Sequence, residues 1–122
     1  KVIVAEDNLV NQKVMESFLK KWGVNATIVG NGLEAIEELK NSDFDLILMD
    51  LEMPEMDGYE AATFIRNMED TSKKDVPIIA LTAAALSDVK EKVYSVGMND
   101  FVTKPFNPVE LRRKLSDIDK NK

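Results

Sequence analysis

Residues 46–58, LILMDLEMPEMDG, open with a run of apolar side chains that ends abruptly at Asp50. Two similar short runs lie at residues 2–5 (VIVA) and 76–81 (VPIIAL). Continuous apolar runs of this length are typical of parallel strands that are buried on both faces. We therefore predict three central strands of a parallel sheet, with helices covering both sides.

Helical patterns alternate with these strands along the chain. Shorter apolar runs predict two further strands, at 24–29 and 101–102, and polar residues 69–75 are predicted to form a loop. The resulting order is (βα)5, an α/β fold. Right-handed crossovers favour a doubly wound, flavodoxin-like five-stranded sheet with strand order 2-1-3-4-5. The expected helices carry apolar stripes over residues 14–22, 33–39, 61–68, 86–96 and 111–118.

Composition limits the classes of protein that this chain can represent. With 122 residues and 44% hydrophobic content, it suits one domain, 1–122, with a single core. The absence of cysteine and histidine excludes disulfides, thiolate metal sites and a histidine general base. The net charge of -6 argues against binding to nucleic acid or an anionic membrane. No signal peptide or membrane-spanning run is present, so we expect a cytoplasmic domain, although a parent protein could be membrane-anchored.

Polar side chains follow the predicted strands at the points where the strands end. Glu6 and Asp7 follow the first strand, Asp50 ends the third, Thr82 ends the fourth and Lys104 follows the fifth. Carboxyl ends of parallel strands meet at one edge of the sheet, next to the switch point in strand order. Carboxylates brought together there repel each other unless a cation offsets their charge. Because the ligands are all hard oxygens, the sequence predicts Mg²⁺, with Mn²⁺ as an alternative.

Each of these residues also has an ordinary structural explanation. Asp7 or Asn8 could cap the first helix, Asp57 could cap the helix that begins near Gly58, and Lys104 could be a surface charge. All of these polar groups, however, follow apolar strands and lie at the same edge of the predicted sheet. That shared position favours the functional interpretation.

Four segments together resemble the receiver domain of two-component response regulators. They are VIVAEDN (2–8), LILMDLEMPEMDG (46–58), PIIALTA (77–83) and DFVTKPF (100–106), and the resemblance covers essentially the whole chain. GMNDFVTKPF (97–106) and the asparagines of residues 6–11 are most similar to receivers of hybrid sensor histidine kinases. We therefore expect a single receiver domain excised from a longer chain.

The resemblance implies a role for each residue at the metal. Asp50 is the phosphoacceptor and also a metal ligand, and Asp7 is a direct ligand. Glu6 acts through water, and Glu52 contributes its backbone carbonyl. A phosphohistidine of a histidine kinase or a histidine phosphotransfer domain is the implied donor. Phosphoryl transfer passes through a loose transition state, which needs positioning and charge neutralisation. A site without a histidine base can therefore catalyse it.

The resemblance further implies how the phosphoryl group is held and sensed. Thr82 and Lys104 contact its oxygens, and the bond from Lys104 to Pro105 is cis. Phe101 follows the movement of Thr82, which shifts the face formed by the fourth helix, fifth strand and last helix. We also predict that Glu52 and Ala84 set the lifetime of the phosphate. The domain then catalyses its own phosphorylation and slow dephosphorylation and turns over no other substrate.

Other readings of the sequence predict different activities. A phosphorylation-independent binding module would usually have lost one residue of the set, and a haloacid-dehalogenase-type phosphohydrolase needs a second Asp where this chain has Glu52. The acidic segment after the first strand opposes a flavodoxin, and no GxxxxGK motif for a nucleotide phosphate loop occurs. Val10, Val14 and Met15 lie where a four-helix-bundle partner would dock in the receiver family, but the core would explain them equally well.

Overall fold

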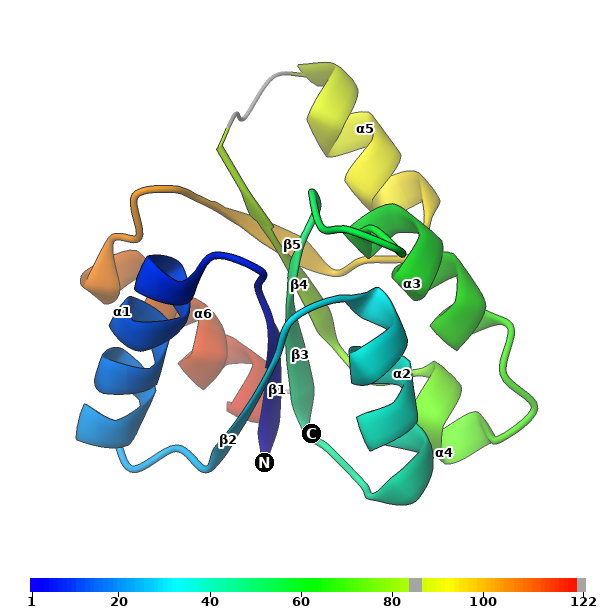
Figure 1. Cartoon of the computed structure of the whole chain (residues 1–122), viewed down its shortest axis with the longest axis horizontal. Helices are drawn as coiled ribbons and strands as arrows, with labels where there is room; N and C mark the ends of the chain where they lie inside the picture. The colour runs from blue at the N-terminus through cyan, green and yellow to red at the C-terminus, as the bar shows by residue number, and fades with distance from the viewer. Residues whose placement is uncertain (84–86, 121–122) are drawn as a thin grey trace.

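The computed structural model describes residues 1–83 and 87–120, whose strands form one parallel sheet in the order β2-β1-β3-β4-β5 (Figure 1). This is the predicted strand order. β1 and β3 pair in register with Ala5 opposite Met49, so their carboxyl ends lie side by side. The strands are β1 (Val2–Ala5), β2 (Ala26–Val29), β3 (Leu46–Asp50), β4 (Ile78–Thr82) and β5 (Asp100–Thr103).

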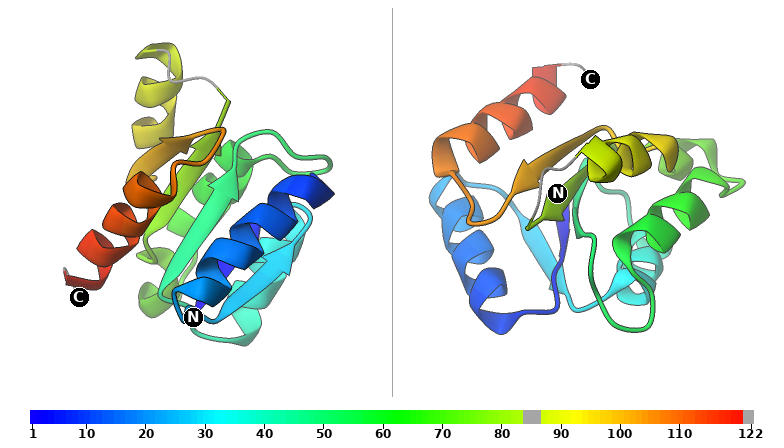
Figure 2. Two further views of the ribbon diagram at one scale, coloured as in Figure 1. Left: turned by 90° about the vertical axis from the view of Figure 1, so that its left-hand side faces the viewer. Right: turned by 90° about the horizontal axis from the view of Figure 1, so that it is seen from above.

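Helices cover both faces of the sheet. α1 and α6 lie on one face, and α2, α3, α4 and α5 lie on the other (Figure 1). The left view of Figure 2 shows α1 and α6 in front of the strands. The helices are α1 (Leu9–Lys21), α2 (Gly32–Asn41), α3 (Gly58–Arg66), α4 (Thr71–Lys74), α5 (Ser87–Ser95) and α6 (Pro108–Lys120).

Alternating strand residues build two separate hydrophobic cores. On β3, Ile47 and Met49 pack beneath α2, α3 and α5, whereas Leu46 and Leu48 pack beneath α1 and α6. Successive side chains of a strand point to opposite faces, so a continuous apolar run is what a doubly covered strand requires. Every residue of β1, β3 and β4 is buried, which confirms the prediction of three central strands.

Two details differ from the sequence-based expectations. The polar segment predicted as a loop contains the one-turn helix α4, because the Asp70 side chain accepts a hydrogen bond from the backbone N–H of Ser72 and caps the turn. Val14 belongs to the predicted apolar stripe of α1 but is 38% exposed. Met15 and Leu19, one helical turn apart, occupy the core instead.

Candidate functional site

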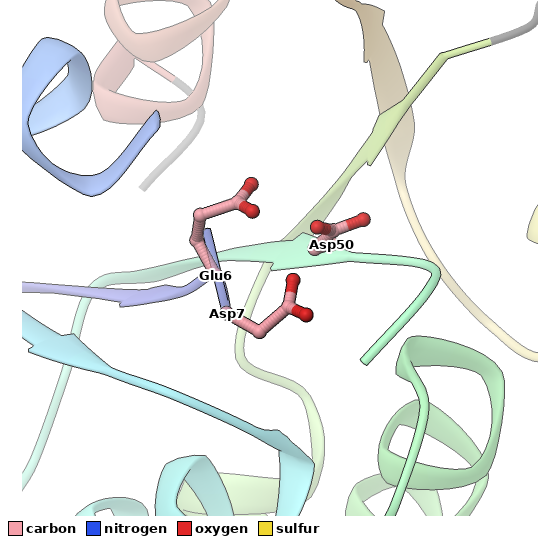
Figure 3. Close-up of side chains that lie close together, drawn as sticks. All are labelled: Glu6, Asp7 and Asp50. Atoms are coloured by element: carbon pink, nitrogen blue, oxygen red, sulfur yellow. The ribbon is translucent and has the colours of Figure 1, made fainter. Parts of the chain in front are cut away.

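The candidate site lies where β1 and β3 end. Glu6 and Asp7 follow β1, and Asp50 is the last residue of β3, so the three carboxylates come together at the switch point of the sheet (Figure 3). Asp50 is 4% exposed and Glu6 only 1%, whereas Asp7 is exposed to solvent. The site therefore has a buried floor and an accessible mouth.

Lys104 brings a positive charge to this acidic floor. Its Nζ lies 2.9 Å from Asp50 Oδ2 and 2.9 Å from Glu6 Oε2. The backbone N–H of Lys104 donates to the carbonyl of Thr82 at 2.7 Å, and the peptide bond between Lys104 and Pro105 is cis. The loop after β5 is thus tied to the end of β4, with its lysine directed at the carboxylates.

The pKa values of Glu6 and Lys104 reflect this arrangement. Burial raises the pKa of Glu6, and the neighbouring Asp50 carboxylate raises it further, while the contact with Lys104 acts in the opposite direction. Burial lowers the pKa of the Lys104 ammonium, but its contacts with Asp50 and Glu6 outweigh that effect and raise the pKa above its ordinary value. Lys104 therefore stays charged at neutral pH.

Backbone geometry fixes the Asp50 carboxylate. The N–H of Glu52 donates to Asp50 Oδ1 at 3.1 Å, and the N–H of Leu51 donates to the carbonyl of Leu81 at 3.1 Å. Gly58, the first residue of α3, passes so close that a Cβ on it would lie 2.4 Å from the Asp50 carbonyl oxygen. Glycine at position 58 lets α3 begin directly beside the end of β3.

Helix caps hold the loops around the site. The side chain of Asn8 accepts a hydrogen bond from the N–H of Asn11, and Asp57 forms a capping box with Glu60. These are the structural roles that the sequence allowed for Asn8 and Asp57. Gln12 was missed by the sequence analysis, although its Nε2 donates to the Glu6 carbonyl at 2.5 Å. Polar residues are common in the first turn of a helix, so the sequence does not indicate that Gln12 contacts Glu6.

Thr82 and Phe101 lie on the strands next to Asp50. Thr82 is buried at the end of β4, and β3 pairs with β4 so that Asp50 lies opposite Leu81. Phe101 is half-buried on β5, and the ammonium groups of Lys90 and Lys114 lie 5.4 Å and 5.2 Å from its ring centroid. Ala84, the other predicted determinant of phosphate lifetime, lies outside the described residues.

The acidic cluster and Lys104 line a cavity of about 790 Å³. Glu52, Thr82 and Ala83 also line it, and so do Tyr59 of α3 and Val89 and Lys92 of α5. Nothing in the sequence marks Tyr59, Val89 or Lys92 as part of a site. Their helical positions carry no signal of a site, and only the packing of α3 and α5 brings them to the cavity.

The acidic cluster suits a hard divalent cation. One carboxylate oxygen from each of Glu6, Asp7 and Asp50 lies within 4.8 Å of the others. The contact between Glu6 Oε2 and Lys104 is an ion pair without hydrogen-bond geometry, so this buried oxygen keeps acceptor capacity. Mg²⁺ prefers one or two carboxylates with several waters, and the exposed Asp7 leaves room for water at the mouth.

The family model of the response regulator receiver domain matches residues 2–116. The chain belongs to this family. The receiver fold is also that of its structural neighbours. The receiver domain of a Pseudomonas aeruginosa sensor histidine kinase, solved with magnesium in its active-site cleft, is 42% identical and superposes with a TM-score of 0.87 over 95% of this chain and 93% of that one.

Two further relatives of this receiver domain place it among phosphorelay proteins. Hybrid signal transduction histidine kinase B of Dictyostelium discoideum is 46% identical over 97% of this chain, which spans 6% of that relative's length. A Saccharomyces cerevisiae receiver domain, solved in complex with a histidine phosphotransfer protein, is 37% identical with a TM-score of 0.87, covering 94% of this chain and 85% of that one.

No helix within residues 1–83 and 87–120 of this receiver domain is long and apolar enough to span a membrane.

Proposed function

We propose that Asp50 accepts a phosphoryl group from a phosphohistidine of a histidine kinase or a histidine phosphotransfer protein. The observation that carries this proposal is the Lys104 ammonium, 2.9 Å from Asp50 Oδ2 within the cluster of Glu6, Asp7 and Asp50. A buried carboxylate paired with a lysine, at the accessible end of a central strand, is a nucleophile that needs no general base.

In the proposed reaction, an Asp50 oxygen attacks phosphorus while the bond from phosphorus to the imidazole nitrogen breaks. Lys104 and the Thr82 hydroxyl stabilise the phosphoryl oxygens as the loose transition state forms. Mg²⁺, held by Asp7, Asp50, the Glu52 carbonyl and, through water, Glu6, would neutralise the remaining charge. The product is a mixed anhydride, which water hydrolyses slowly, so the signal is temporary.

Thr82 and Phe101 are the proposed elements of the switch. Drawing the Thr82 hydroxyl toward the phosphoryl group frees space beside β4, and the half-buried Phe101 ring on β5 turns into it. That movement displaces the face formed by α5, β5 and α6. The exposed Glu52 remains our candidate, with Ala84, for control of phosphate lifetime.

α1 is the surface that we assign to the phosphodonor partner. Leu9 and Val10 are each 70% exposed, and Val14 is partly exposed on the same helix, whereas Met15 is fully buried. Val10 and Val14 therefore lie at the surface of α1, and Met15 lies in the core. The relative solved with a histidine phosphotransfer protein supports a partner of that kind. We propose that the parent protein is a hybrid histidine kinase and that this domain works in the cytoplasm.

Phosphorylation by a small donor tests the acceptor directly. Incubation with Mg²⁺ and acetyl phosphate should add one acid-stable, base-labile phosphoryl group by intact mass, and Asp50→Asn should abolish it. An adduct that survives Asp50→Asn would overturn the assignment. Absence of any adduct would favour a phosphorylation-independent module, and steady release of phosphate from a phosphomonoester would favour a phosphohydrolase.

Substitution of α1 tests the partner surface separately. Val10→Asp should slow phosphotransfer from a histidine phosphotransfer protein by about tenfold, because a desolvated interface loses about 1–3 kcal/mol when it must accept a charge. Phosphorylation by acetyl phosphate should not change. Equal rates of phosphotransfer for Val10→Asp and the wild type would contradict this role of α1.

A further inference from the structure

The cavity beside Asp50 is lined by a second cation, Lys92, that the proposed function does not use. Lys92 lines the cavity together with Tyr59 and Val89. Val89 and Lys92 are three residues apart on α5 and so share one face of the helix, and Val89 packs against the core beneath α2, α3 and α5. The face that carries Lys92 is therefore fixed toward the cavity.

Tyr59 holds the Lys92 ammonium in place. Lys92 Nζ lies 4.3 Å from the centroid of the Tyr59 ring, a cation–π contact that joins α5 to α3. Tyr59 itself is half-buried at the start of α3, and burial, with the nearby Asp57 and Glu52 carboxylates, raises the pKa of its hydroxyl. The ring is thus neutral at physiological pH and faces an acidic surface.

The charges around the cavity show why a second cation matters. Five carboxylates line it, against two ammonium groups, a net charge of −3: Glu6, Asp7, Asp50, Glu52 and Asp57 against Lys92 and Lys104. Lys104 is committed to two ion pairs. Within the described part of the chain, by contrast, Lys92 Nζ forms no ion pair with a carboxylate and instead contacts the Tyr59 ring.

We propose that Lys92, positioned by Tyr59, determines donor specificity by favouring small phosphodonors that release an anion. The inference rests on Asp50 being the phosphoacceptor. Acyl phosphates are the donor class that fits, because they approach as dianions and release a carboxylate. Phosphoramidate is the contrasting donor, because it approaches as a monoanion and releases neutral ammonia.

The charges of the transfer step explain the selectivity. With an acyl phosphate, an Asp50 oxygen forms a bond to phosphorus, the bond between phosphorus and the acyl oxygen breaks, and the electron pair leaves with the carboxylate. The Lys92 ammonium attracts the carboxylate as its charge develops. With phosphoramidate, the bond from phosphorus to the protonated nitrogen breaks, and the electron pair leaves with the nitrogen and cancels its positive charge. The donor carries one negative charge fewer than an acyl phosphate and its leaving group ends neutral, so Lys92 attracts it less strongly.

The test compares the two donors on charge-altered variants in the presence of Mg²⁺. Lys92→Met keeps an extended stem over the Tyr59 ring and removes the charge. We expect its second-order rate constant of phosphorylation, measured by intact mass, to fall about threefold to tenfold with acetyl phosphate and less than twofold with phosphoramidate. Lys92→Arg should restore the rate with acetyl phosphate, and raising the ionic strength should shrink the difference between wild type and Lys92→Met.

Matched variants separate this effect from a change in fold. Lys90→Met removes a lysine from the same helix that does not line the cavity, and it should leave the donor preference unchanged. Tyr59→Phe should behave as wild type, while Tyr59→Leu should lose part of the preference for acetyl phosphate. Equal loss with both donors, or no loss, in Lys92→Met would overturn the inference. If the wild type accepts phosphate from neither donor, the proposed function itself fails, which is a different result.

Discussion

Glu6 is the charged residue whose burial has the clearest energetic consequence. It is 1% exposed, and its folded-state pKa is raised by desolvation and by Asp50, against the pull of Lys104. Folding therefore favours the protonated form of this carboxyl. The ordinary pKa of a glutamate side chain is 4.5, and the pKa of Glu6 in the folded protein is higher. As the pH rises through this interval, ionisation of Glu6 lowers the stability of the metal-free protein.

Glu6→Gln should therefore stabilise the metal-free domain at neutral pH, by an amount on the order of 1 kcal/mol. Urea denaturation across pH provides the measurement. The gain over wild type should vanish below pH 4.5, where glutamate is protonated, and should level off above the raised pKa. Glu16→Gln, at an exposed position, serves as control and should not be stabilised at neutral pH. A variant less stable than wild type at neutral pH would mean that the ion pair with Lys104 outweighs the burial of Glu6.

At the scale of elements, the junction between β3 and α3 decides where the phosphoacceptor lies. The N–H of Gly58 donates to the Leu51 carbonyl at 3.2 Å, so α3 begins against the end of β3. Backbone atoms on both sides of this contact cannot move aside as a flexible side chain would. The glycine in the MPEMDG stretch therefore has a packing reason that the sequence pattern alone did not reveal.

Gly58→Ala should lower the free energy of unfolding by about 1–3 kcal/mol, because its Cβ would lie 2.4 Å from the Asp50 carbonyl oxygen. The same displacement should slow phosphorylation of Asp50 by acetyl phosphate. Chemical denaturation and intact mass measure the two effects. Gly30→Ala is the matched control, since its Cβ would meet only the far end of the Glu34 side chain at 3.3 Å. Similar losses in both variants would exclude the proposed clash as the cause.

At the scale of the whole molecule, the acidic site links metal binding to stability. Glu6, Asp7 and Asp50 extend from two strands of the central sheet, so a cation that bridges them is bound only by the folded chain. Ligands that bind only the folded state stabilise it in proportion to the logarithm of their concentration. Mg²⁺ should therefore raise the thermal midpoint of the domain.

At a hundredfold excess of Mg²⁺ over its Kd, wild type should gain about 2.7 kcal/mol. Asp7→Asn should lose most of this gain, yet it should be no less stable than wild type without metal, because it removes a charge that neighbours two other carboxylates. Thermal unfolding at matched ionic strength measures both. An equal response to Mg²⁺ in the two proteins would show that Asp7 is not a ligand.

The pattern of apolar residues was enough to predict the five strands in order and every helix except α4. A strand buried on both faces and a helix buried on one face space their apolar residues differently. The sequence also identified the polar residues at the strand ends, since parallel strands present their carboxyl ends at one edge. The structure brings Glu6, Asp7, Asp50 and Lys104 together at this edge.

Which distant side chains meet depends on how the helices pack on the sheet. The Arg66 guanidinium joins α3 to the chain on either side of β4, donating to the carbonyls of Lys74, Val76 and Gly97. The contact of Lys92 with Tyr59 likewise depends on how α3 and α5 pack. Periodicity records whether a residue faces the core, but not which residue from another element lies against it. That is set by the packing of whole elements on the sheet, which is why the second cation of the cavity could not be found from the sequence.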